Sequence, residues 1–271
     1  VAAPWSPPAW MKTTKSLYSG SLDLAYEEVY ANYLFKFIEA YASEGITIDY
    51  ISIQNEPYHG TANYPVNFMD YDQAIRVSIL LGRLLEASEH PTKIMGWDHN
   101  TDAYEYGIYL LDDEEARQYI SGIAFHGYSG DIYDLEFAYS SLKEAHPDKS
   151  IYFTEITAGA WSVDFALNLS HGMENYIQGI INNSARMVLY WNLVLNEDYG
   201  PKLGGCSNCM GIINLANDDT WYAHSSEYYA LAHISKFIRT DLGEAKRIDV
   251  ESSNQMILAT GFLRADNKIV V

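Results

Sequence analysis

The stretch Ile46-Thr-Ile-Asp-Tyr-Ile-Ser-Ile-Gln-Asn-Glu-Pro57 decides the fold class of this chain. The apolar run over 46–53 predicts a buried β-strand, which leads directly into the polar sequence Gln54-Asn-Glu-Pro57. Before it, apolar residues recur at helical spacing over 30–41, and Gly45 is a C-cap for that helix. A helix followed by a buried strand that ends in polar residues is typical of an α/β protein.

The same alternation of helix and strand continues along the chain. Further strands are predicted over 93–97, 122–125, 150–154 and 187–190, and helices over 70–88, 133–145, 170–181 and 223–237. Strands that alternate with helices predict a parallel sheet wrapped by helices. A (β/α)8 TIM barrel is favoured over a doubly wound sheet, because no glycine-rich phosphate turn follows the first strand.

The last thirty residues have a different pattern. Three consecutive strands are predicted over 245–250, 256–262 and 268–271, with no helix between them. We therefore expect a barrel domain over 1–240 and the start of an antiparallel β-sandwich over 241–271. The abrupt first and last residues suggest a fragment, in which the first barrel strands and most of the sandwich are absent.

Composition restricts the choice of ligand. The chain has 17 Lys and Arg against 36 Asp and Glu, a net charge of −19, which disfavours nucleic acid as a partner. Its 23 Tyr and 6 Trp suit a neutral sugar, although such rings serve packing at least as often. No stretch has the length and apolar character of a transmembrane segment. The composition leaves the oligomeric state open.

Two glutamates stand at predicted strand ends. Glu56 lies between Asn55 and Pro57 after one strand, and Glu155 follows Thr154 at the end of another. Glycoside hydrolysis needs one carboxylic acid to protonate the leaving oxygen and a second carboxylate to attack the anomeric carbon or to activate water. The alternative, two ordinary carboxylates in surface ion pairs, does not explain why both stand at strand ends.

Several residues at the strand ends are candidates for binding substrate. Asn55 is positioned to hold a sugar 2-hydroxyl. His126 and Tyr128 lie two residues apart after a strand and therefore point to the same side, where Tyr128 could donate a hydrogen bond to Glu155. A packed aromatic ring is the alternative interpretation of Tyr128.

Three further candidates are Trp191, Trp5 and Asp98. Trp191 follows a strand and could form the apolar floor beneath a sugar, or could be a buried barrel aromatic. Trp5 and Asp98 are weaker candidates for contact with substrate.

The cysteine and histidine spacing argues against a metal. Cys206 and Cys209 lie in a glycine-rich loop without a second ligand pair, so we expect no zinc site. A disulfide and two free thiols both remain open. His59, His99 and His126 lack the tight spacing of metal ligands, and no G-x-S-x-G motif points to a serine hydrolase. We expect neither a metal nor another cofactor.

The ordered set of motifs resembles glycoside hydrolase family 30, which includes glucosylceramidases and endo-β-1,6-glucanases. The matching segments are Pro4-Trp-Ser-Pro-Pro-Ala-Trp-Met-Lys12, Gln54-Asn-Glu-Pro57, Ile123-Ala-Phe-His-Gly-Tyr128, Phe153-Thr-Glu155, Tyr190-Trp-Asn-Leu193 and Ala230-Leu-Ala-His-Ile-Ser-Lys-Phe237. Glucosylceramidases usually have Trp where this chain has Gly127, and the loop around Cys206 resembles that of the β-glucanases.

The resemblance implies a hydrolase that retains configuration at the anomeric carbon, with Glu56 as acid/base and Glu155 as nucleophile. Its substrate would be glucosylceramide or a β-1,6-glucan, without a cofactor, and its location secreted or lysosomal. We expect the neighbouring carboxylate to raise the pKa of Glu56 and keep it neutral. The alternative functions are an inactive carbohydrate-binding barrel and an inactive truncated fragment.

Overall fold

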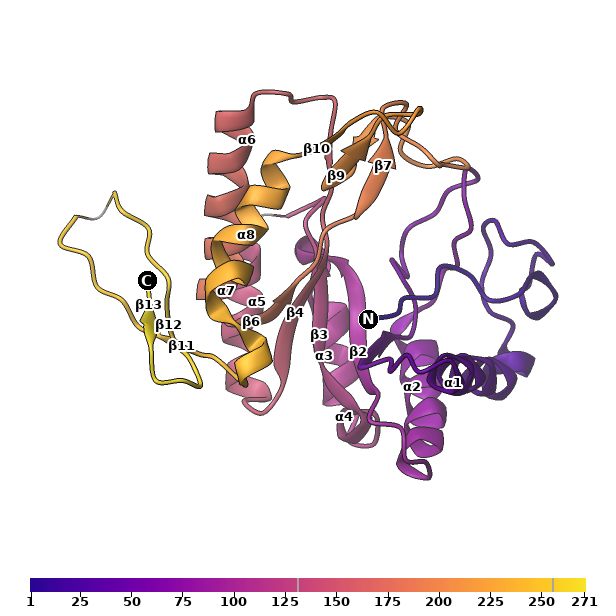
Figure 1. Ribbon diagram of the computed structural model, residues 1–271. Coiled ribbons are helices and arrows are strands. Elements are labelled where there is room, and N and C mark those ends of the chain that lie inside the picture. The colour runs from indigo at the N-terminus through magenta and orange to yellow at the C-terminus, as the bar shows by residue number, and fades with distance from the viewer. Residues whose placement is uncertain (131, 255) are drawn as a thin grey trace. The chain divides into compact units, whose positions relative to one another are not determined.

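The computed structural model describes residues 1–130, 132–254 and 256–271. The chain divides into two compact units, Val1–Tyr152 and Phe153–Val271. Figure 1 shows the course of the chain through both of them. None of the helices in the described ranges is both long enough and apolar enough to cross a bilayer.

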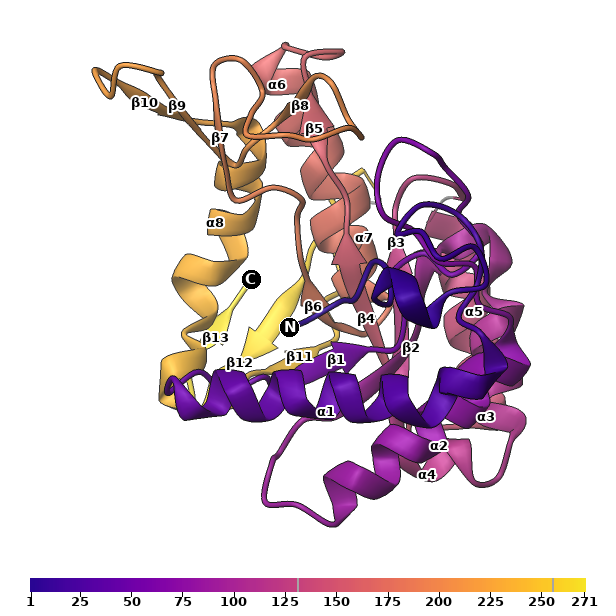
Figure 2. The same ribbon diagram turned by 90° about the vertical axis from the view of Figure 1, so that its right-hand side faces the viewer.

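The first unit is a layer of parallel strands with helices packed on it. Its strands are β1 (Tyr50–Ser52), β2 (Lys93–Asn100), β3 (Ile120–His126) and the beginning of β4 (Ser150–Glu155). Its helices are α1 (Glu27–Ser43), α2 (Tyr71–Glu86), α3 (Glu105–Asp112), α4 (Ala116–Tyr119) and α5 (Ile132–Ala145), with 3-10 turns at Ala9–Met11, Leu24–Tyr26 and Thr101–Ala103. Helices α1 and α2 contact each other and cross at an angle (Figure 2).

Burial explains why these segments form strands and helices. In β3 almost every residue is buried, which is the pattern of a parallel strand covered on both faces. In α2 the side chains of Val77, Leu81 and Leu85 recur at a spacing of four and form one buried face. Asp70 is the N-cap of helix α2, and its side-chain carboxylate accepts a hydrogen bond from the Gln73 N–H at 2.8 Å.

The second unit contains the end of β4, a helical layer and small sheets, of which β10-β9-β7 is mixed because β7 and β9 are parallel. Its remaining strands are β5 (Ala158–Gly159), β6 (Ala185–Val188), β7 (Val194–Asn196), β8 (Cys209–Met210), β9 (Ile213–Leu215), β10 (Tyr222–His224), β11 (Lys246–Ile248), β12 (Gly261–Leu263) and β13 (Ile269–Val270). Its helices are α6 (Phe165–His171), the π-helical segment Gly172–Gln178, α7 (Gly179–Asn182) and α8 (Ser226–Ile238), with a 3-10 turn at Thr240–Leu242. Ile177, Ile181 and Ala230 join these helices in one buried cluster.

The arrangement of strands confirms the predicted α/β architecture. The main sheet has the order β1-β2-β3-β4-β6, and the pairs β1–β2 and β2–β3 are parallel. The last three strands form an antiparallel sheet in the order β11-β12-β13, as predicted. The predicted domain boundary after residue 240 sets these three strands apart from the rest of the second unit, and it stays a prediction.

Other details differ from the sequence predictions. The strand predicted over 46–53 is limited to Tyr50–Ser52. The helix predicted over 170–181 begins earlier, with α6, and becomes π-helical at Gly172. The helix predicted from residue 223 begins at Ser226, because Tyr222–His224 pairs with β9 instead. Strands β5 and β7 to β10 were not predicted, since two or three residues are too few to show an alternating pattern.

Candidate active site

Glu56 follows β1 in a backbone conformation that a side chain rarely adopts. Its φ angle is +47°, in the left-handed region, and its N–H donates a hydrogen bond to the Asp98 carbonyl at 3.0 Å. Such a conformation costs of the order of 1–3 kcal/mol and persists only where the surroundings enforce it. The Glu56 side chain is only 12% exposed, so its carboxylate faces protein groups more than water.

A β-bulge in β2 brings the consecutive polar residues Asp98 and His99 close to Glu56. Trp97 and Asp98 have φ angles of +69° and +60°, and the register between β2 and β3 shifts between Trp97 and His99. In a regular strand, neighbouring side chains point to opposite faces, whereas a bulge redirects one of them. Asp98 and His99 are both buried, and the His99 ring approaches Glu56, with 3.7 Å between Nδ1 and Oε1.

His126, at the end of β3, joins Glu56 to Asp98. Its Nδ1 lies 3.1 Å from Glu56 Oε1 and its Nε2 lies 3.1 Å from Asp98 Oδ1. The ring is fully buried. With an N–H at Nε2 that donates to Asp98, Nδ1 of the neutral ring accepts a hydrogen bond from protonated Glu56, whereas Nδ1 of the imidazolium donates one to ionised Glu56. The three side chains therefore form a chain in which Glu56 can exist in either protonation state.

The electrostatic surroundings of Glu56 contradict the expected direction of its pKa shift. Burial raises the pKa of Glu56, but the hydrogen bond from His126 and the charge of that ring, with smaller contributions from His99 and His59, together outweigh it, so the pKa lies below its ordinary value. The prediction of a raised pKa was wrong because it considered only a second carboxylate. Burial lowers the pKa of His99 to about 4, so that ring is neutral at neutral pH.

Asn55 offers a buried hydrogen-bond acceptor next to Glu56. The residue is 6% exposed, and its Oδ1 has no hydrogen-bond partner among the described residues. Its N–H donates to the Pro4 carbonyl at 2.9 Å, and the Gln54 side chain donates to the Trp5 carbonyl at 2.9 Å. These bonds place the segment that carries Trp5 beside the end of β1. The Trp5 ring packs on Tyr64 with 5.3 Å between centroids.

Tyr128 lies beyond His126 and is 43% exposed. Its ring centroid is 6.1 Å from that of His126, and its N–H donates to Asn100 Oδ1 at 3.1 Å. The predicted hydrogen bond from Tyr128 to Glu155 stays a prediction.

Glu155 and Trp191 belong to the second unit. Glu155 is the last residue of β4. Trp191 follows β6, its N–H donates to the Ile156 carbonyl at 2.8 Å, and it pairs with Thr157. Both residues therefore stand at the carboxyl ends of neighbouring strands, where the sequence placed them. Trp191 is 37% exposed, which fits a ring that contacts a ligand better than a fully buried one.

The structure therefore brings together Glu56, His126 and Asp98, of which Asp98 was the weakest candidate. The part that sequence reasoning missed is His99 as a neighbour of Glu56. The ligand atoms of Glu56, His99 and His126 lie within 4.8 Å of one another, a spacing that a metal ion tolerates. We assign no ion to them, because His126 and Glu56 are already partners in the hydrogen bond described above.

Comparison with known proteins identifies the family. The sequence model of the glycosyl hydrolase family 30 TIM-barrel domain matches residues 1–238, and the chain belongs to this family. The predicted family and barrel fold are thereby confirmed.

Curated relatives carry two kinds of name. An endo-1,6-beta-D-glucanase of Aspergillus fumigatus is 31% identical over 88% of this chain and 50% of its own length. A putative glucosylceramidase of Caenorhabditis elegans is 30% identical over 100% of this chain and 54% of its own length. This chain thus spans about half the length of the curated relatives it matches.

Among solved structures, the endo-beta1,6-glucanase BT3312 superimposes with a TM-score of 0.89 and 32% identity. The alignment covers 97% of this chain and 61% of that one.

Proposed function

We propose that this chain carries the catalytic residues of a retaining β-glycosidase that acts by double displacement. Glu56 is the acid/base and Glu155 the nucleophile. Membership in glycosyl hydrolase family 30 supports a glycosidase. In a retaining mechanism the two carboxyl groups have different tasks, because only one of them must change its protonation state in each step.

The observation that carries this assignment is the chain Asp98–His126–Glu56. In the first step Glu56 donates its proton to the leaving oxygen and becomes a carboxylate, which the hydrogen bond to His126 at 3.1 Å stabilises. In the second step the Glu56 carboxylate takes a proton from the water that releases the sugar. Asp98 holds Nε2 of His126 at 3.1 Å and so fixes the ring in both steps.

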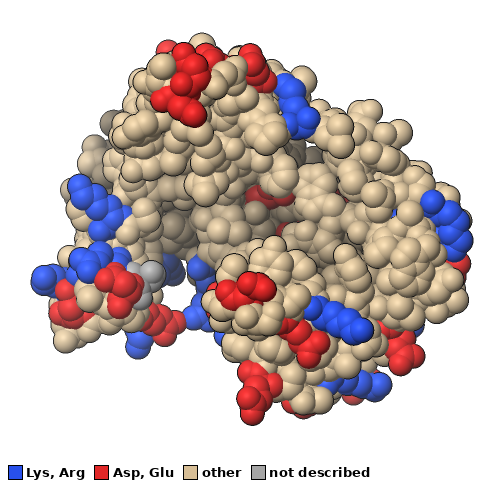
Figure 3. Space-filling view, turned by 45° about the vertical axis from the view of Figure 1, so that its right-hand side comes forward, with Lys and Arg blue, Asp and Glu red and all other residues tan. Residues whose placement is uncertain are grey.

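The residues around the glutamates have binding roles in this proposal. The unpartnered Oδ1 of Asn55 accepts a hydrogen bond from the sugar 2-hydroxyl, a contact that strengthens in the transition state. Trp191 contributes an apolar ring beneath the sugar, and Trp5 and Tyr128 contribute to its walls. Most of the molecular face in Figure 3 carries uncharged side chains, which suits a neutral substrate.

The proposed substrate is a β-1,6-glucan. Three of the curated relatives, at 30–31% identity, and the solved structure at 32% identity carry the name of an endo-1,6-glucanase. Glucosylceramide is the second candidate, because the putative glucosylceramidase matches 100% of this chain.

The proposed location is extracytoplasmic, either secreted or lysosomal. Cys206 and Cys209 form a disulfide, which resolves the alternative left open by the sequence. Disulfides persist in oxidising compartments and are rare in the cytosol. One relative is also named a lysosomal enzyme.

The test compares hydrolysis of a β-1,6-glucan, glucosylceramide and an aryl β-glucoside by the wild type and by three variants. Glu56→Gln should lose roughly 10²–10⁴-fold on the glucan, which needs an acid, and far less on an aryl glucoside with a good leaving group. Glu155→Ala should lose turnover on every substrate. Glu144→Gln, at an exposed position on α5, is the matched control and should behave like the wild type.

Added azide separates the two roles by the configuration of the product. In Glu155→Ala, azide replaces the nucleophile and attacks from its side of the sugar, giving an α-glycosyl azide. In Glu56→Gln, azide attacks the covalent intermediate and gives a β-glycosyl azide. Unimpaired turnover in Glu56→Gln and Glu155→Ala, or no turnover in the wild type, would contradict the catalytic assignment and leave a binding barrel.

A further inference from the structure

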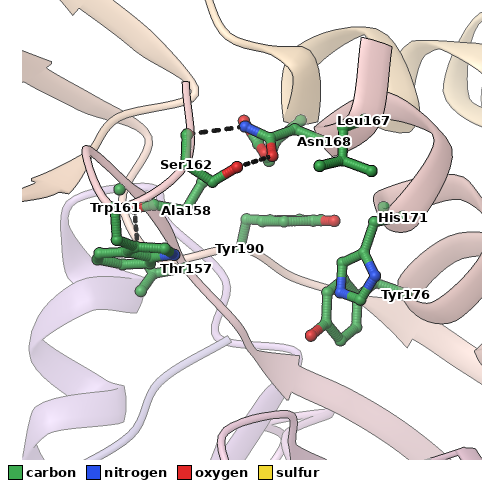
Figure 4. A pocket seen from close by; sticks show the side chains of 12 residues that line it. Thr157, Ala158, Trp161, Ser162, Leu167, Asn168, His171, Tyr176 and Tyr190 are labelled. Carbon is green, nitrogen blue, oxygen red and sulfur yellow. Dashed lines mark hydrogen bonds between the residues drawn. The ribbon is translucent and has the colours of Figure 1, made fainter. Parts of the chain in front are cut away.

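The second unit contains a cavity of about 320 Å³ whose lining includes neither of the proposed catalytic glutamates. It begins at Thr157, two residues after Glu155, and its walls come from the loop after β4, from α6, from the π-helical segment and from the start of α8 (Figure 4). The lining residues are Thr157, Ala158, Gly159, Trp161, Ser162, Leu167, Asn168, His171, Gly172, Tyr176, Tyr190 and Glu227.

Tyr190 presents an unused hydroxyl group in this cavity. Its Oη is buried and has no hydrogen-bond partner among the described residues. A buried polar group without a partner is costly, so an unpaired hydroxyl in a cavity indicates a ligand or water. Burial raises the pKa of Tyr190 well above its ordinary value, so the group keeps its proton and acts as a donor. Figure 4 shows the ring reaching across the cavity toward His171 and Tyr176.

The opposite wall is held in place by hydrogen bonds. The hydroxyl of Ser162 donates to Asn168 Oδ1 at 2.5 Å, and Asn168 Nδ2 donates to the Ser162 carbonyl at 2.8 Å. Gly159 allows the Trp161 ring to pack on the backbone, since a β-carbon there would lie 2.0 Å from the ring. The cavity is therefore preformed, with an aromatic ring and hydroxyl and amide groups in fixed positions.

The chemistry of the lining selects a neutral polyhydroxylated ligand. Among the described residues that line the cavity, none is Lys or Arg, and Glu227 adds a carboxylate, so an anion is disfavoured. Aromatic rings pack on the apolar face of a pyranose, while Tyr190 donates to its hydroxyl groups and Glu227 accepts from them. The volume lies near the lower end of the range of about 300–1,000 Å³ for ligand sites, which suits a small ligand.

We propose that this cavity is a second, non-catalytic binding site for a single neutral pyranose such as glucose. The proposal goes beyond the hydrolytic function and does not depend on it, because every group that it uses lies outside the proposed catalytic residues.

The test is titration of the protein with D-glucose, followed by calorimetry and by saturation-transfer NMR. Tyr190→Phe keeps the ring and removes the hydroxyl, and it should weaken glucose binding roughly three- to tenfold. Gly172→Ala is a second variant, because its added carbon would lie 3.6 Å from Tyr190 Oη, an ordinary contact that fills space beside the hydroxyl without a clash. Tyr229→Phe, which removes a hydroxyl from α8 outside the lining, is the matched control and should bind glucose like the wild type.

Two further measurements distinguish this site from binding at the catalytic glutamates and from an aromatic cation site. Glucose should bind the double variant Glu56→Gln, Glu155→Gln with unchanged affinity, whereas binding at the catalytic glutamates would change it. Tetramethylammonium, a probe for an aromatic cation site, should not compete with glucose. Equal glucose affinity in the wild type, Tyr190→Phe and Gly172→Ala, or displacement by tetramethylammonium, would overturn the proposal. Loss of hydrolysis in the glutamate variants is measured separately, so either proposal can fail without the other.

Discussion

Replacing His126 with Gln should shift the pH dependence of hydrolysis. In the wild type the Nδ1 atom of His126 contacts Glu56 and its Nε2 atom contacts Asp98, each at 3.1 Å. The amide nitrogen of Gln can take the place of Nε2 and keep a partner for Asp98. It cannot also supply Nδ1 or the positive charge of the imidazolium. The variant therefore removes the influence on Glu56 and spares the contact with Asp98.

The direction in which the pH profile moves follows from the direction of the pKa shift of Glu56. His126 holds the pKa of Glu56 below its ordinary value, although burial alone would raise it. Glu56 must be protonated to act as an acid, so kcat/KM falls as the pH rises through that pKa. Without His126 the burial effect remains, the pKa of Glu56 rises, and the alkaline limb of the profile moves to higher pH.

The size of the effect follows from the lost hydrogen bond. A hydrogen bond to a charged group contributes about 1.5–3 kcal/mol, and each 1.4 kcal/mol is a factor of ten. At a fixed pH on the alkaline limb, the ratio of protonated to ionised Glu56 should therefore increase on the order of ten- to a hundredfold.

The assay is kcat/KM against pH on an aryl β-glucoside whose leaving group requires protonation. His146→Gln is the matched control, because His146 is also buried and paired with a carboxylate, with 3.2 Å between its Nε2 and Asp112 Oδ1. Its profile should coincide with that of the wild type. An alkaline limb that stays in place or moves to lower pH in His126→Gln would refute the reasoning about Glu56.

Three other perturbations test the fold and the site. Cys206→Ser opens a disulfide with a sequence separation of 3, and guanidinium denaturation should show a loss of roughly 1.5–2 kcal/mol in unfolding free energy by the chain-entropy relation. Gly122→Ala would place a carbon 2.1 Å from the Ser150 carbonyl oxygen, so the free energy of unfolding should fall by about 1–3 kcal/mol or more. Gly60→Ala is its control, because the added carbon meets no atom within 4 Å and the variant should unfold like the wild type. Asn55→Ala should lower kcat/KM roughly tenfold on a glucoside and hardly at all on its 2-deoxy analogue, and equal losses on both would contradict its contact with the 2-hydroxyl.

The positions of the strand-end residues could be predicted from the sequence because a single rule governs them. Parallel strands that alternate with helices have their carboxyl ends at one edge, so Glu56, His126, Glu155 and Trp191 were recognised by what precedes them. The long helices followed from periodicity in the same way. Local patterns were sufficient wherever the structure is regular over many residues.

The electrostatics of the site could not be predicted in this way. The pKa of Glu56 depends on His126, which is 70 residues away in sequence, and on a burial that only the folded chain defines. The position of Asp98 depends on the bulge in β2, and the bulky residue Trp97 gives no local signal for the left-handed conformation that it adopts there. Sequence reasoning placed Glu56 correctly after a strand and gave the wrong direction for its pKa.

The backbone of β2 explains how Glu56 is held. Glu56 and Asp98 both have left-handed φ angles, and the Glu56 N–H donates to the Asp98 carbonyl at 3.0 Å. This hydrogen bond joins the two residues that have unfavourable backbone conformations. The indole of Trp97 also stabilises the bulge, because its Nε1–H donates to the Asn100 carbonyl at 2.9 Å. Because the same bulge presents Asp98 to His126, one local departure from strand geometry both orients Glu56 and places the partner of His126. The strain at these positions is therefore the structural cost of placing a carboxylic acid, an imidazole and a second carboxylate in one hydrogen-bonded line.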